Sequence, residues 1–89
     1  MTAAPRPAPG AVAATLLRLA TERGHDRSIC PSEVARALAP EDWRPLMGAV
    51  RAEAVRLARE GAVEVLRKGR PVADLDSLRG VIRVRIAPR

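Results

Sequence analysis

The sequence LAREGAVEVLRKGRPV, residues 57–72, decides the fold class because its hydrophobic period changes partway along. Up to Gly61, apolar residues recur every three or four positions, as on one face of a helix. After Gly61, Val63 and Val65 alternate with Glu64, as in a half-buried strand. The run Lys68–Pro71 that follows is a turn signal. This stretch therefore predicts the junction between a helical part and a β part of one domain.

Three helices are predicted upstream of this junction, at residues 11–23, 31–39 and 42–60. Gly24 ends the first, Pro31 suits the first position of the second, and Pro40 ends it. Asp42 is expected to cap the third helix, and Gly61 to end it. The apolar faces of these helices predict a core that contains Val12, Ala13, Leu16, Leu17, Ala20, Val34, Ala35, Leu38, Trp43, Leu46, Met47, Val50, Ala54, Leu57 and Ala58.

A second strand is predicted downstream, where Ile82, Val84 and Ile86 alternate with arginines. Residues 67–80 are too many for a tight turn, and Leu75 and Leu78 are expected to anchor this loop. The order of elements predicts an α+β fold: a winged helix-turn-helix of three helices followed by a two-stranded β wing, over residues 11–87. Residues 1–10 contain three prolines among small residues and are expected to form a disordered tail.

Several separate blocks resemble a family of small bacterial winged-helix-like proteins catalogued as a domain of unknown function. The blocks are ICPSEVARAL at 29–38, WRPLM at 43–47, KGRPV at 68–72 and IRVR at 82–85. They span nearly the whole domain in the same order. The resemblance implies a winged-helix-like fold, and it transfers no activity and no functional residue.

The composition is basic, with a formal charge of +6 from 16 Lys and Arg against 10 Asp and Glu. A basic surface attracts polyanions such as nucleic acid. The abundance of Arg, Ala, Pro and Gly also fits a GC-rich genome, which would explain part of the bias without any function. Most of the excess charge, +4, lies in residues 62–89, and residues 41–61 are neutral in sum.

The predicted third helix separates its charges by face. Arg44, Arg51 and Arg59 fall on one flank of its exposed side, and Glu53 and Glu60 on the other. Such a helix could enter the major groove of DNA. The alternative is a solvated face of weak ion pairs, in which Arg56 pairs with Glu53 or Glu60.

The wing supplies a second set of candidates, Arg67, Lys68 and Arg70, of which the last two should lie at the tip and contact phosphates. The alternative is a soluble tip, with Glu64 paired to Arg83 or Arg85 across the strands. Ser32, at the start of the second helix, is a candidate for holding one phosphate. Ordinary helix-start chemistry is the alternative there.

Catalytic and metal chemistry lack the residues they need. Cys30 is the only cysteine and His25 the only histidine, so neither a disulfide nor a zinc site is expected. His25, Asp26 and Ser28 are neighbours in a loop, which is not the geometry of a catalytic triad. Trp43 lies on an apolar face and is expected in the core. We therefore predict no enzyme activity and no cofactor.

The sequence predicts a cytoplasmic protein, since it lacks a signal-peptide pattern and any long apolar run. The predicted function is a small nucleic-acid-binding module, with double-stranded DNA favoured over structured RNA. The alternative is a winged-helix adaptor that binds a protein partner and no nucleic acid. The oligomeric state is left open.

Overall fold

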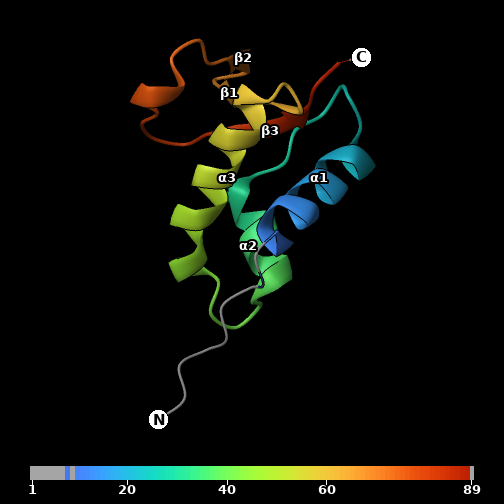
Figure 1. Ribbon diagram of the computed structural model, residues 1–89, viewed down its shortest axis with the longest axis vertical. Helices are drawn as coiled ribbons and strands as arrows, with labels where there is room; N and C mark the ends of the chain where they lie inside the picture. The colour runs from blue at the N-terminus through green and yellow to red at the C-terminus, as the bar shows by residue number, and fades with distance from the viewer. Residues whose placement is uncertain (1–7, 9, 89) are drawn as a thin grey trace.

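The structure, a computed structural model, describes residue 8 and residues 10–88. The predicted disordered tail, residues 1–10, lies mostly outside the described residues. Three helices lie below a small sheet, with α1 and α3 on opposite sides and α2 between them (Figure 1). Their bounds are α1 Ala11–Arg23, α2 Pro31–Leu38 and α3 Met47–Arg59. The first two match the predicted helices to within one residue, because glycine and proline end them where the sequence signals.

The predicted third helix is shorter than expected at its start. Residues Arg44–Leu46 form a 3₁₀ turn, η1, and the α-helix begins only at Met47. The Leu46 amide donates to the Trp43 carbonyl and the Met47 amide to that of Arg44, which are the i to i+3 bonds of a 3₁₀ turn. Asp42 does not cap a helix. Its backbone amide instead bonds the carbonyl of Ala39.

The sheet has three antiparallel strands in the order β2-β1-β3, where two were predicted. The strands are β1 Val63–Arg67, β2 Arg70–Pro71 and β3 Arg83–Ile86. The unexpected strand β2 forms because Lys68 and Gly69 both have positive φ, 52° and 79°, the geometry of a type I′ turn. This turn folds the chain directly back onto β1, and the Val72 amide then bonds the Val65 carbonyl at 2.8 Å. Strand β2 thus occupies the start of the segment that was expected to be a loop.

Among the described residues, one isolated β-bridge joins the helical half to the sheet. Ile29, between α1 and α2, exchanges two backbone hydrogen bonds with Val84 of β3, at 2.7 and 2.8 Å. Strand β3 therefore lies between β1 and the segment that leads into α2. This bridge fixes the start of α2 relative to the sheet.

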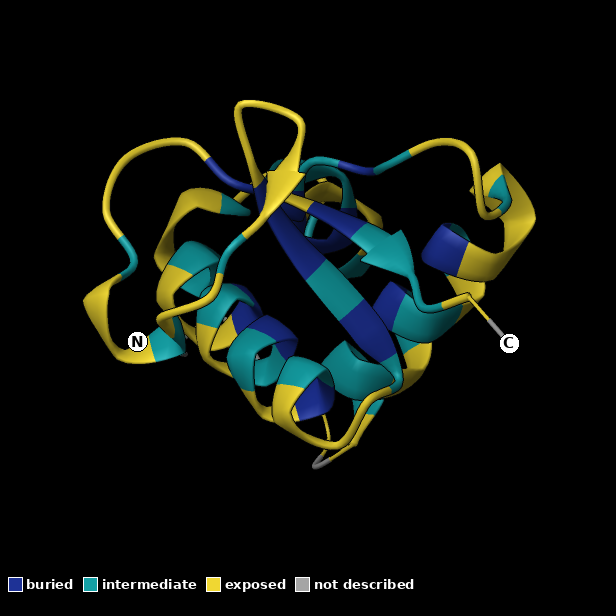
Figure 2. Cartoon of the chain, turned by 90° about the horizontal axis from the view of Figure 1, so that it is seen from above, coloured by how far each residue is buried: buried dark blue, intermediate teal, exposed yellow. Residues whose placement is uncertain are grey.

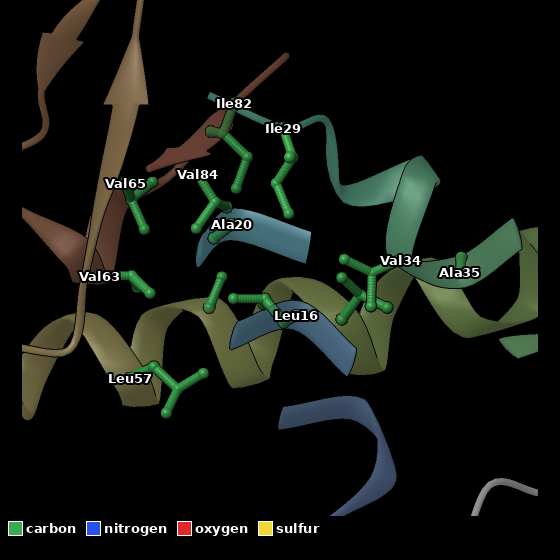
Figure 3. Close-up of a cluster of buried hydrophobic side chains, with 12 residues drawn as sticks. Leu16, Ala20, Ile29, Val34, Ala35, Leu57, Val63, Val65, Ile82 and Val84 are labelled. Atoms are coloured by element: carbon green, nitrogen blue, oxygen red, sulfur yellow. The ribbon is translucent and has the colours of Figure 1, made fainter. Parts of the chain in front are cut away.

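The core lies between the helices and the inner face of the sheet (Figure 3). Val63 and Val65 of β1 point inward together with Val84 of β3, as the period-2 pattern predicts. Leu75 and Leu78 pack against this core from the loop, as expected, and Trp43 is half-buried at its edge. The buried residues of the cluster are Leu16, Ala20, Ile29, Val34, Ala35, Val50, Ala54, Leu57, Val63, Val65, Ile82 and Val84.

Candidate nucleic-acid interface

The β1–β2 hairpin carries three cations within four residues. All three, Arg67, Lys68 and Arg70, are exposed, as is Gly69 between them (Figure 2). None of the three forms an ion pair with a carboxylate of the described residues. Two open, shallow hollows lie at the hairpin. One is lined by Arg67, Lys68 and Arg70 and the other by Arg67, Lys68 and Arg83, with no acidic residue in either. The hairpin therefore presents its cations to solvent without internal competition.

The tight turn fixes where these cations lie. A non-glycine residue with positive φ is uncommon, and Lys68 takes it because Gly69 and the strand pairing impose the turn. Arg67 and Arg70 face each other across the two strands as a register pair. The turn and the strand pairing therefore fix the backbone positions of three neighbouring cations. This arrangement suits contact with neighbouring phosphates.

The exposed face of α3 is different, because two of its three predicted contact residues have internal partners. Arg51 donates to the carbonyl of Gly80 at 2.8 Å. Arg59 forms an ion pair with Asp76, which lies in the 3₁₀ turn η2, Leu75–Ser77. These two contacts tie α3 to the loop between β2 and β3.

Arg56 pairs with both acidic residues of α3, as one of the sequence alternatives predicts. Its guanidinium lies 2.8 Å from the Glu53 carboxylate and also contacts Glu60. The hydrogen bond and charge of Glu53, aided by Glu60, raise the pKa of Arg56 above its ordinary value. Two carboxylates and one guanidinium leave this flank of α3 as a solvated surface with a small excess of negative charge.

Arg44 lies apart from this set, at the first residue of η1. Its guanidinium carbon stands 4.7 Å from the centroid of the Trp43 ring. Arg36 of α2 stands over the same ring at 4.5 Å. Arg36 is not predictable as a site residue from the sequence, because the turn that brings α2 back against Trp43 gives no periodic signal.

Ser32 lies inside the cap of α2. Its hydroxyl donates to the Cys30 sulfur at 3.1 Å, and the Glu33 carboxylate accepts from the Cys30 amide at 2.7 Å. Together with the bond from the Glu33 amide to the Cys30 carbonyl, these contacts give α2 a capped start. The arrangement accords with ordinary helix-start chemistry at this position.

Glu33 also pairs with Arg23 at the end of α1. Partial burial acts to raise the pKa of Glu33, but the bond from the Cys30 amide and the neighbouring Arg23 outweigh it, so this pKa lies below its ordinary value. Arg23 in turn donates to the Ser28 carbonyl at 3.0 Å. The pair therefore joins α1, the following loop and α2.

The cations of β3 are also engaged. Arg85 pairs with Glu64 across the strands at 2.7 Å, as one alternative predicts. Arg83 instead reaches Ser28, donating to both its hydroxyl and its carbonyl at 2.7 Å. The sequence does not indicate that arginines contact Ser28, Asp76 and Gly80, since these pairings join residues 17 to 55 positions apart.

Other kinds of site find little support in this part of the chain. The described residues hold no group of three His, Cys, Asp or Glu side chains that could bind a metal ion. Among the described helices, none combines the length and apolar character that a membrane crossing requires.

The sequence matches a known protein family. The family model described as "Protein of unknown function (DUF3253)" matches residues 9–87, which is most of the chain. No match was found among the curated proteins.

Proposed function

The chain belongs to this family of proteins of unknown function (DUF3253), and because that description assigns no activity, we propose a function from the surface of the molecule. We propose that the protein is a double-stranded DNA-binding module that holds the phosphate backbone with its β1–β2 hairpin. Arg67, Lys68 and Arg70 make these contacts. The proposal depends on one observation: these three exposed cations have no acidic partner among the described residues.

The order of elements supports a winged helix-turn-helix as the framework of this module. Helices α2 and α3 follow one another through a connection, residues 39–46, that includes η1, and the β1–β2 hairpin follows α3. In helix-turn-helix proteins the second of two such helices enters the major groove. In this framework α3 is the groove-facing helix, and the hairpin is the wing that lies on the adjacent backbone.

The different contacts of α3 and the hairpin determine how strongly and how selectively the protein should bind DNA. Contacts with phosphate give affinity without sequence information. Arg51 and Arg59 must release Gly80 and Asp76 before they reach DNA. We therefore propose modest affinity that depends on salt and discriminates weakly between sequences.

Duplex DNA fits this arrangement better than duplex RNA. The 13 residues of α3 make a rod roughly 20 Å long. The major groove of B-DNA is about 12 Å wide and admits a helix, whereas that of A-form RNA is too deep and narrow for side chains to read.

The test is a fluorescence-anisotropy titration of the protein into a labelled random DNA duplex at several salt concentrations. If about four phosphates are contacted, the slope of log K against log salt is about −3.6. Replacing both Lys68 and Arg70 by Ala should remove two phosphate contacts. The affinity should then fall roughly 60-fold at 0.1 M salt, and the slope should become less steep by about 1.8. Duplex RNA and single-stranded DNA serve as competitors in the same assay.

The matched control replaces Arg18 and Arg27, which are exposed in α1 and the loop after it, by Ala. It removes the same charge from another face, so binding should stay near that of the unmodified protein. Equal losses in both variants, or no binding at low micromolar protein, would contradict the proposal. Absence of binding would leave the protein adaptor as the better function, with the exposed Val81 beside the hairpin as its contact.

A further inference from the structure

Two arginines are gathered around the only aromatic residue of the protein. Arg36 comes from α2 and Arg44 from η1, and their guanidinium carbons lie 4.5 and 4.7 Å from the centroid of Trp43. Both arginines are exposed, while Trp43 is half-buried. Glu41 and Asp42 are close in sequence, yet neither forms an ion pair with these arginines. The cluster is therefore a positively charged surface whose two cations have only a ring as their described partner.

The ring positions the guanidiniums without neutralising them. A guanidinium over an aromatic face is held by the ring quadrupole and keeps its full charge. Its N–H groups lie in the plane of the guanidinium and can still donate, two at a time, to the oxygens of a phosphate. Holding the side chain in place beforehand lowers the entropy lost when an anion binds. Exposed arginines without such support lack this advantage.

The cluster lies at the far end of α3 from the hairpin. The loop that contains Trp43 precedes α3 at the lower end of the molecule, and the hairpin stands at the upper end (Figure 1). The roughly 20 Å of α3 between them exceeds the width of the B-DNA major groove, about 12 Å. The two cationic sites are thus far enough apart to reach the backbones on either side of that groove.

We propose that Arg36 and Arg44, supported by Trp43, form a second phosphate-binding site for the DNA backbone, across the major groove from the hairpin. This inference rests on the proposed function and adds the residues of a second anchor. It also assigns Arg44 a phosphate contact. With an anchor at each end, on opposite backbones, α3 is held in one orientation relative to the groove.

The experiment uses Trp43 as its own reporter, because the chain contains no other Trp and no Tyr or Phe. Unlabelled random duplex is titrated into the protein while Trp43 emission is recorded, and anisotropy of a labelled duplex is measured in parallel. We expect the emission to change over the same concentration range as the anisotropy, and the change to be reversed by added salt.

The variant is Arg36→Gln, and Arg27→Gln is the control, since Arg27 is also exposed and without an acidic partner among the described residues. Loss of one phosphate contact should weaken binding about eightfold at 0.1 M salt and lower the salt slope by about 0.9. Arg36→Lys, which keeps the cation, should recover most of that slope. Thermal unfolding of each variant shows that the fold is retained.

The two levels of the proposal fail in different ways. If the anisotropy responds while Trp43 emission stays constant and Arg36→Gln binds like the unmodified protein, the second site is wrong and the hairpin proposal stands. If neither signal responds to duplex DNA, the proposed function itself is wrong, and the second site with it.

Discussion

The cations of α3 and those of the β1–β2 hairpin are close in sequence but differ in what they contact. Arg51, Arg56 and Arg59 of α3 reach the Gly80 carbonyl, the helix's own glutamates and Asp76. The hairpin cations, which follow within a few residues, find no carboxylate in the described structure. The difference shows that the number of arginines in a segment does not measure the charge it offers to a partner. In α3, Arg51 and Arg59 link the helix to the loop after β2, and Arg56 pairs locally with Glu53 and Glu60. The cations of the hairpin are available for binding.

The largest effect should come from breaking an arginine contact that holds helices together. Replacing Glu33 by Ala removes both the acceptor for the Cys30 amide and the partner of Arg23. We expect the free energy of unfolding to fall by about 1–2 kcal/mol, mostly from the lost cap, since the exposed ion pair adds little. In a domain of this size that lowers Tm by roughly 4–8 °C per kcal/mol. Glu22→Ala, which breaks the exposed pair with Arg18, is the control and should change Tm little.

The same contact predicts how stability depends on pH. Because the pKa of Glu33 is lower in the folded protein than its ordinary value of 4.5, its contribution is fully present above that value. It is lost as the pH falls below 4.5 through the folded-state pKa. Urea unfolding from roughly pH 7 to pH 3 should therefore show the difference between the unmodified protein and Glu33→Ala shrinking in acid. A difference that stays constant with pH would mean that the carboxylate charge has no part in it.

The sequence predicted the elements of the fold whose signals lie in neighbouring residues. Helices α1 and α2 end at glycine and proline, and the valines of β1 alternate, so these elements follow from neighbouring residues. Strand β2 was missed because two residues carry no period, although the turn at Lys68 and Gly69 that creates it was visible. The prediction placed Lys68 and Arg70 at an exposed turn after β1, where the structure has them, but it closed the hairpin with the strand at residues 82–86, whereas β2 closes it in the structure.

What the sequence did not reveal is which arginines are engaged. The pairs Arg59–Asp76 and Arg51–Gly80 join residues 17 and 29 positions apart, and they depend on how the loop after β2 folds back on α3. Arg56 pairs within its own helix, at spacings of three and four, and was predictable for that reason. Long-range side-chain contacts need the tertiary structure, whereas contacts within a helix need only its period.

A smaller effect should come from converting an engaged arginine of α3 into a free one. Asp76 is highly exposed, and its carboxylate pairs only with Arg59 in the described structure, so Asp76→Asn should leave the fold intact and release that guanidinium. If Arg59 then reaches a phosphate, affinity for duplex DNA should rise about eightfold at 0.1 M salt and the salt slope should steepen by about 0.9.

The control for this variant is Glu22→Gln, which frees Arg18 on α1 with the same change in net charge. Anisotropy titrations of the two variants separate the position of the charge from its amount. An equal gain in affinity in both variants would show that net charge alone sets the affinity. It would contradict the view that the position of a free cation decides whether it contributes to DNA binding.

The smallest effect should be that of removing the hairpin cations Lys68 and Arg70 on the free energy of unfolding. Because Lys68 and Arg70 are exposed and have no acidic partner among the described residues, replacing both by Ala should change the free energy of unfolding by no more than about 0.5 kcal/mol. Gly69→Ala, in the same turn, should cost about 1 kcal/mol or more, because its φ of 79° strains any residue with a Cβ. Urea unfolding measures both.

A loss above about 1 kcal/mol in the double variant would mean that these cations stabilise the fold as the arginines of α3 do. A DNA-binding defect in that variant could then be explained by instability, whereas an unchanged stability assigns the defect to the lost positive charge.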